Sequence, residues 1–279
     1  MFFSSIIYYV ITRYSQRRNI DRKLYLAVNF LIPTIVYLIL GLSRGYRFHY
    51  GINVLLISFF VAFFLNFIGS VASYISMRHA PNAGYSVIIQ KSYGLYTSIV
   101  AVFLFGATLT LIKYFAILII VGSLFIVSIS NKKKSKHPLK ADWVFLAFIG
   151  FVCYGTSALI GKQVISSGIP SVVYLFWVLL FSTAICMMDI VKDWKDINKK
   201  VNKKDICVLL LVGFSVSFFY YFKQVAEIAA PNIGYVNAIN AASNVFLTLF
   251  LALIFKESLT PGKFVGVVGV VFGIILLIV

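Results

Sequence analysis

A row of amide side chains stands inside an otherwise apolar stretch near the end of the chain. Asn237, Asn240, Asn244 and Thr248 recur at steps of three, four and four residues within the run Gly234–Phe255. These steps place them on one face of a helix. Polar groups inside an apolar helix either bond to neighbouring helices or line the path of a polar solute. We take the solute path as the site hypothesis and keep the structural interpretation beside it.

Two polar residues occupy an earlier apolar run, Gly84–Phe105. Gln90 stands 150 residues before Asn240, and Lys91 follows it about a third of the way into the run. An unpaired lysine in the middle of a membrane costs about 2.5–3.5 kcal/mol on insertion scales. Lys91 therefore either faces water or a substrate, or extends its stem so that the ammonium reaches the interface.

Further candidates lie in two other apolar runs. Lys223 and Glu227 are four residues apart and can neutralise each other on one helix. Glu227 is also the one carboxylate within an apolar run and away from a loop cluster, so it is our candidate for proton coupling, with Lys223 as its partner. Tyr154 and Tyr220 could add hydroxyls or rings to a cavity, although Tyr is common at membrane interfaces.

The elements that must position these residues are membrane helices. The sequence is 61% hydrophobic and only 12% charged, with a mean hydropathy of +0.96. Such a composition indicates a polytopic membrane protein whose surroundings are the lipid bilayer. The net charge of +17 comes from short basic clusters between the apolar runs, so we expect no nucleic-acid partner.

The apolar runs predict nine spanning helices in an all-α transmembrane bundle. A tenth segment, Met1–Tyr14, is apolar but too short to span unaided. We expect a truncated first helix or a half-helix there. The nine predicted spans are Leu24–Leu42, Val54–Ser76, Gly84–Phe105, Leu111–Ser130, Trp143–Ile165, Ser171–Ile190, Ile206–Ala229, Gly234–Phe255 and Gly262–Val279.

The chain repeats itself. The phrase A-P-N-x-G-Y occurs at residues 80–85 and again at 230–235, and later matches such as Lys113 with Lys263 keep the same offset. We therefore predict one duplication: a first repeat over 1–130 with an incomplete first helix, a basic linker over 131–142, and a second repeat over 143–279. Each repeat holds an odd number of helices, which predicts opposite orientations of the two copies.

Lysine and arginine set the expected orientation. Nineteen of them fall on one side of the predicted helices and three, Arg44, Arg47 and Lys113, on the other. The positive-inside rule makes the first side cytoplasmic and places Val279 outside.

The chain resembles the EamA family of the drug/metabolite transporter superfamily. The resemblance rests on the A-P phrase that opens the fourth helix of each repeat, and on the ending F-K-E-S-L-T-P-G-K-F-x-G-x-x-G-x-x-x-G-I from Phe255 to Ile274. It implies two five-helix repeats and the export or exchange of small metabolites through a central cavity. The first repeat departs from the pattern, because Gly106-Ala107-Thr108 stands where the second has Lys256-Glu257-Ser258.

We predict a secondary transporter of small organic metabolites in the cell membrane, which works by uniport or by exchange with protons. The sequence has no P-loop and no metal-binding or catalytic motif, so we expect neither a cofactor nor an enzyme. A flippase for a lipid-linked sugar or phosphate is the alternative, and a membrane scaffold that does not transport is another. The glycines at 262, 266, 269 and 273 predict close helix packing or a homodimer face.

Overall fold

The computed structural model of the chain describes residues 1–97, 100, 110–128, 143–191, 193–194, 197, 201–229 and 233–278. Within these ranges the side chains of residues 224, 227–229, 233–239 and 277–278 are not described.

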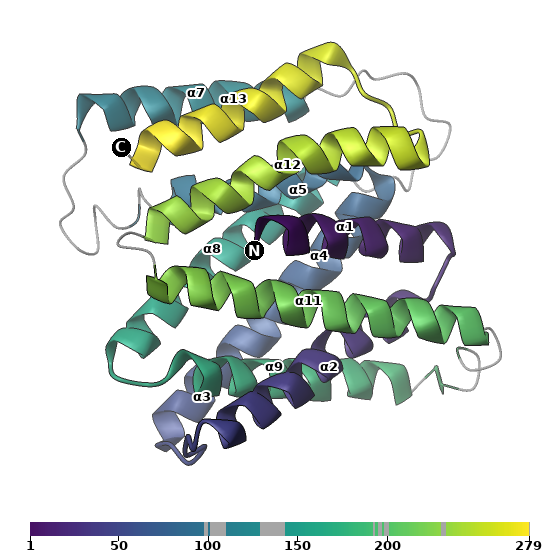
Figure 1. Cartoon of the computed structure of the whole chain (residues 1–279), viewed down its shortest axis with the longest axis vertical. Coiled ribbons are helices and arrows are strands. Elements are labelled where there is room, and N and C mark those ends of the chain that lie inside the picture. The colour runs from purple at the N-terminus through teal and green to yellow at the C-terminus, as the bar shows by residue number, and fades with distance from the viewer. Residues whose placement is uncertain are drawn as a thin grey trace.

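Helices make up all the regular structure of the described residues, which confirms the predicted all-α bundle (Figure 1). Five are long and apolar enough to cross a membrane by length and composition, and three shorter ones are also apolar. The helices are α1 (Phe2–Arg17), α2 (Arg22–Ser43), α3 (Ile52–Phe60) continued by the π-helical η1 (Val61–Phe67) and α4 (Ile68–His79), α5 (Ala83–Lys91), α7 (Leu111–Ser128), α8 (Trp143–Ser166), α9 (Ser171–Val191), α11 (Lys203–Ala229), α12 (Ile233–Phe255) and α13 (Pro261–Ile278).

The first helix lies between α11 and α12 and packs on both (Figure 1). Its other side faces outward, where Phe3 and Ile7 are exposed. The 150-residue offset carries Phe2 onto Val152, which lies within α8, so α1 corresponds to the later part of that helix. The side of α1 that packs on its neighbours can carry polar residues that a side turned to lipid could not. This face includes the buried Ser5, Thr12, Arg13 and Gln16.

The starts of the later helices follow the predicted duplication, although α5 ends at Lys91, short of the predicted span Gly84–Phe105, whereas α12 continues to Phe255. The same offset carries Ala83, the start of α5, onto Ile233, the start of α12, and Leu111 of α7 onto Pro261 of α13. The basic linker predicted over 131–142 lies outside the described residues, so the division into domains stays a prediction.

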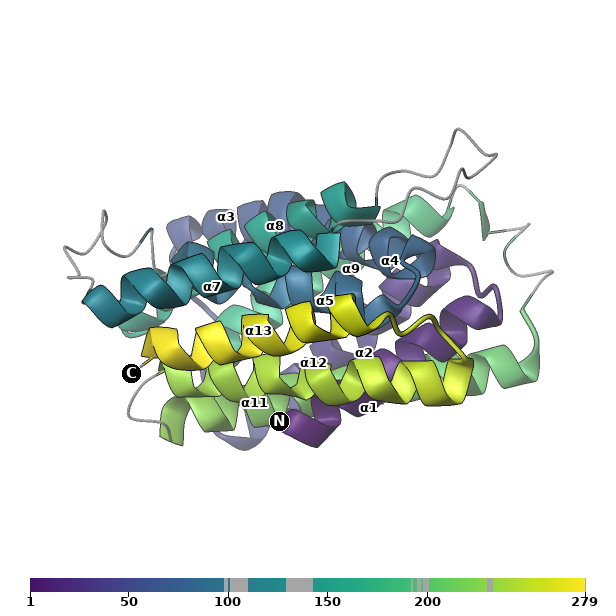
Figure 2. The same ribbon diagram turned by 90° about the horizontal axis from the view of Figure 1, so that it is seen from above.

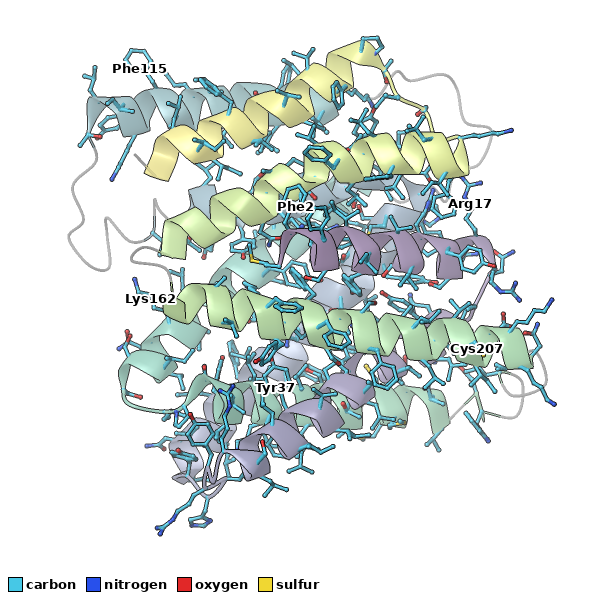
Figure 3. All side chains as sticks on the ribbon, viewed as in Figure 1. Phe2, Arg17, Tyr37, Phe115, Lys162 and Cys207 are labelled. Carbon is cyan, nitrogen blue, oxygen red and sulfur yellow. The ribbon has the colours of Figure 1, made fainter. Side chains whose placement is uncertain are left out.

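The last helix packs along α7 through its small residues. A Cβ added at Gly266 would lie 2.9 Å from the main-chain oxygen of Ser123, and one at Gly273 would lie 2.6 Å from the Ile120 side chain. Gly266, Gly269 and Gly273 of the predicted stripe are therefore occupied within the chain itself, whereas a Cβ at Gly262 would meet nothing within 4 Å. The opposite face of α7 points outward, as Phe115 does at the edge of the bundle in Figure 3.

One end of the bundle collects the charged connections. The α1–α2 and α12–α13 connections lie together at this end, whereas the α8–α9 connection lies at the other (Figures 1 and 2). Arg17 and Lys162 mark the two ends in Figure 3. Arg18 bonds to Asp205 at 2.8 Å, and Lys23 contacts Asp189 at 2.8 Å, so that α9 and α11 are fixed to the start of α2. We call this end of the bundle, where the α1–α2 and α12–α13 connections lie, the basic end.

Candidate functional site

The two helices that begin with the repeated phrase cross at very short range. A Cβ added at Gly84 of α5 would lie 2.3 Å from Oγ1 and 2.9 Å from Cα of Thr248 on α12. Asn82 accepts a hydrogen bond from the Gly84 amide, which caps α5, and donates one to the Thr248 carbonyl. Glycine is thus required where the first half of the chain touches the second.

Lys91 lies at the centre of a polar cluster on this crossing. Its ammonium donates to the hydroxyl of Ser5 at 2.7 Å, the side-chain oxygen of Asn240 at 3.0 Å and the hydroxyl of Ser243 at 3.2 Å. It also lies 4.8 Å from the ring centre of Tyr9. Only 9% of the residue is exposed. The cluster therefore joins α1, α5 and α12 around one buried positive charge.

Gln90 faces a different set of helices. It accepts from Ser73 of α4 at 2.7 Å, donates to Ser86 at 2.8 Å and packs against Gly150 of α8. Neighbouring helical residues point about 100° apart, so Gln90 and Lys91 cannot share one face. The structure brings Lys91, and not Gln90, to Asn240.

Asn244 lies one turn beyond Asn240 on α12 and is completely buried. Its amide nitrogen donates to the Ala241 carbonyl at 3.0 Å, while its side-chain oxygen has no hydrogen-bond partner within the described part of the chain. A buried acceptor without a donor is costly, and such groups concentrate at functional positions. The side chain of Asn237, the first member of the predicted row, lies outside the described residues.

The predicted tyrosines border the cluster on two sides. Tyr154 of α8 interacts with the hydroxyls of Ser70 and Ser73 on α4, which connects it to Gln90. Tyr220 of α11 lies next to Phe219, whose ring centre is 6.0 Å from the Lys91 ammonium. Both tyrosines therefore lie near the crossing, and both belong to the second half of the chain.

The candidate coupling pair is described only in part. Lys223 of α11 lies within electrostatic range of Lys91. The side chain of Glu227 falls outside the described residues, so the structure does not test its role.

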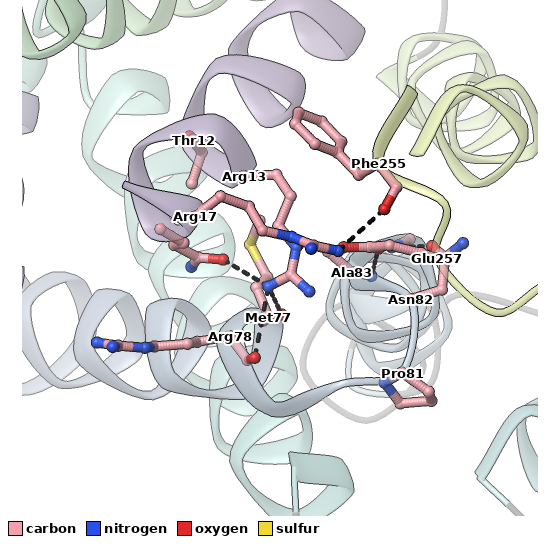
Figure 4. A network of polar contacts seen from close by, with 12 residues as sticks. Thr12, Arg13, Arg17, Met77, Arg78, Pro81, Asn82, Ala83, Phe255 and Glu257 are labelled. Carbon is pink, nitrogen blue, oxygen red and sulfur yellow. Dashed lines mark hydrogen bonds and ion pairs between the residues drawn. The ribbon is translucent and has the colours of Figure 1, made fainter. Parts of the chain in front are cut away.

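A second polar network closes the basic end and was not among the predicted sites (Figure 4). Glu257, in the short hinge between α12 and α13, forms a buried ion pair with Arg13 of α1 and accepts from the Ala83 amide at the start of α5. Arg13 also donates to the Met77 carbonyl at the end of α4. One carboxylate thus joins the hinge of the second half to three helices of the first half.

The model of the EamA-like transporter family matches residues 141–279. The chain belongs to the EamA-like transporter family. No curated protein sequence matches it significantly. One solved structure, described only as the crystal structure of a protein, superposes with a TM-score of 0.66 over 99% of this chain and 94% of the other at 14% identity, and thus shows the same fold.

This EamA-like protein is an integral membrane transporter of the drug/metabolite type, from a family of transporters and not of enzymes.

The residues that sequence reasoning missed come mainly from α1 and the hinge: Ser5, Tyr9, Arg13, Ser243 and Glu257. A signal for them exists, because the polar residues of α1 recur at Ser5, Thr12 and Gln16 on one helical face.

The crossing gives a direct stability test. A Gly84→Ala change inserts a methyl group against the Thr248 backbone, and overpacking of this kind costs about 1–3 kcal/mol. We expect the melting temperature of the detergent-purified protein to fall by several degrees, at about 2–4 °C per kcal/mol. Gly94→Ala on the same apolar run is the control, because its added Cβ meets nothing within 4 Å. Equal melting temperatures for the two variants would contradict the close contact.

Proposed function

We propose that this transporter is a secondary carrier that moves small organic metabolites by alternating access between its two inverted halves. The polar cluster of Lys91, Asn240 and Asn244 supplies the substrate site. The observation that carries the proposal is the crossing of α5 and α12, where side chains from both halves meet around a buried ammonium inside an apolar bundle. We also propose that exchange with protons drives transport and that the protein lies in the cell membrane.

The arrangement of the cluster supports gating as well as binding. Lys91, Asn240 and Asn244 are all buried, so this arrangement corresponds to the closed state of the proposed carrier. The contacts that close it join one half to the other and are therefore the ones that must break when the halves rock. A hollow of about 410 Å³ between α2 and α9, lined by Leu24, Met187 and Trp194 among others, is apolar and lies apart from the cluster.

Thiol accessibility tests the carrier without knowledge of the substrate. Cys153, Cys186 and Cys207 are replaced, and single cysteines are placed at Asn240 or Asn244. We expect a membrane-impermeant thiol reagent to label each position from either side of the membrane, because a carrier exposes its site alternately. The cysteine-free protein with no added cysteine is the control, and it should stay unlabelled.

If the cysteines at Asn240 and Asn244 are labelled no more than the cysteine-free protein from either side, these residues form a dry structural seam. The protein would then be a scaffold, and the carrier proposal would fail.

A further inference from the structure

Every hydrogen-bond acceptor that the structure gives the Lys91 ammonium is electrically neutral. They are the hydroxyls of Ser5 and Ser243 and the two carbonyl oxygens of Asn240. The rings of Tyr9 and Phe219 also lie close to the ammonium, with their centres at 4.8 and 6.0 Å. No carboxylate of the described side chains lies within ion-pair distance of Lys91. The charge is solvated by dipoles but is not neutralised.

The ion pairs that join Asp189, Asp193, Asp205 and Glu257 to arginines or lysines all lie at the basic end, on α1, α2 and the connection between them. Among the described side chains, the polar cluster therefore holds the positive charge of Lys91 without a carboxylate beside it. In a low-dielectric medium this arrangement favours an anion.

Resting on the carrier function proposed above, we propose that Lys91 binds a carboxylate of the transported substrate. The bound group accepts the ammonium hydrogens that Ser5 and Asn240 accept in the closed arrangement. The ammonium already donates to these neutral oxygens, but a carboxylate adds the attraction between two opposite charges in a low-dielectric medium, so the exchange is favourable. Because Ser5 lies on α1 and Asn240 on α12, the same exchange releases α5 from both helices and couples substrate binding to opening.

The rest of the cluster indicates the kind of carboxylate. The rings of Tyr9 and Phe219 flank the ammonium, and Tyr8 stacks on Phe219 with ring centres 6.2 Å apart. A flat or apolar body attached to the carboxylate would lie against these rings. A single ammonium amid hydroxyls suits one negative charge, whereas phosphate sites use arginine forks or rows of amide N–H groups. We therefore expect an aromatic or aliphatic monocarboxylate.

The experiment measures ligand-induced stabilisation of the purified full-length protein at constant ionic strength. Phenylacetate is compared with phenylacetamide, which has the same shape without the charge, and with inorganic phosphate. We expect millimolar phenylacetate to raise the melting temperature, because a ligand that binds the folded state stabilises it, and we expect the amide and phosphate not to.

Variants locate the effect. Lys91→Gln should weaken phenylacetate binding by about tenfold or more, the loss expected for one hydrogen bond to a charged group. Lys91→Arg should retain part of the affinity. Lys113→Gln is the matched control, because Lys113 lies at the start of α7, which packs on α13 and supplies no residue of the cluster. This variant should bind phenylacetate as the unaltered protein does. Should Lys91→Gln fail to fold, the comparison of carboxylate with amide on the unaltered protein decides alone.

Two results would overturn the proposal. One is equal stabilisation by phenylacetate and phenylacetamide, or stabilisation by phosphate only. The other is undiminished phenylacetate binding in a folded Lys91→Gln variant. The carrier function is tested separately, because labelling a cysteine at Asn240 from both sides of the membrane requires no ligand. If the cysteine at Asn240 is labelled from both sides but phenylacetate does not stabilise the protein, only the inference about Lys91 fails.

Discussion

Replacing Glu257 with glutamine is expected to destabilise the protein by about 3–5 kcal/mol, because it leaves the buried Arg13 without its counter-charge. The Arg13 side chain is 8% exposed and that of Glu257 is 1% exposed, so water cannot take over the lost interaction. Glutamine keeps the shape and can still accept from the Ala83 amide. The effect therefore isolates the charge, and a large fall in melting temperature of the purified protein measures it.

Arg17→Gln is the control for this prediction. Arg17 contacts the same carboxylate at 3.4 Å, but its side chain is 48% exposed, and ion pairs in contact with water contribute about 0–1 kcal/mol. We expect a small change only. The double variant Arg13→Met with Glu257→Met should recover much of the stability lost in Glu257→Gln, because a buried ion pair is often replaceable by apolar residues. Equal losses in Arg17→Gln and Glu257→Gln would show that burial of the pair has no role.

The same ion pair has a consequence for transport. It joins the hinge of the second half to α1, α4 and α5 of the first half at the basic end, as Figure 4 shows. Any opening of that end must separate these elements. In Glu257→Gln we expect a thiol at Asn240 to be labelled faster from the basic end than in the unaltered protein, since the closed state has lost its strongest contact there.

The second large effect concerns α1. The hydroxyl oxygens of Ser5 and Ser243 lie 3.4 Å apart, and both side chains are fully buried. In the protein without its native cysteines, the pair Ser5→Cys and Ser243→Cys should form a disulfide under mild oxidation. This bond ties the first half to the second, so we expect labelling of a further cysteine at Asn244 to fall close to zero and to return after reduction.

A cross-link within one half provides the matched control. The hydroxyls of Ser76 and Ser86 lie 2.7 Å apart and join α4 to α5, which both belong to the first half. A disulfide there should leave the labelling at Asn244 unchanged, because the two halves can still separate. Undiminished labelling in the fully oxidised Ser5–Ser243 variant would show that α1 does not have to leave α12 when the site opens.

Much of the fold could be predicted because hydropathy records the length of a lipid-crossing helix directly. The predicted spans Trp143–Ile165 and Ser171–Ile190 each end one residue before the observed helices, at Ser166 and Val191. The start of α11 was placed at Ile206 instead of Lys203, since a lysine-rich first turn lowers local hydropathy without ending the helix. The first helix continues to Arg17, beyond the predicted end at Tyr14, for a similar reason, because its buried Arg13 and Gln16 carry no apolar signal.

The site was only partly predictable. Helical periodicity correctly placed Asn240 and Asn244 on one buried face, but spacing within one helix does not show which residue of another helix meets it. The offset between the repeats aligned Gln90 with Asn240. Residues equivalent by duplication need not touch, and Lys91 is the one in contact. The sequence placed Glu257 in a hinge but could not show its ion pair, because its partner, Arg13, lies 244 residues away in the chain.

The most direct test of alternating access is a pair of distances measured between spin labels in lipid membranes. One pair joins His79 at the end of α4 to Lys204 at the start of α11, at the basic end. The other joins Ile52 at the start of α3 to Gln163 near the end of α8, at the opposite end. These four residues are exposed, and each pair contains one residue from each half.

Rocking of two inverted halves opens one end as it closes the other. We predict two distance populations for each pair, with Glu257→Gln shifting the basic-end pair toward the longer distance and the opposite pair toward the shorter one. A single distance at both ends, the same in Glu257→Gln as in the unaltered protein, would contradict alternating access.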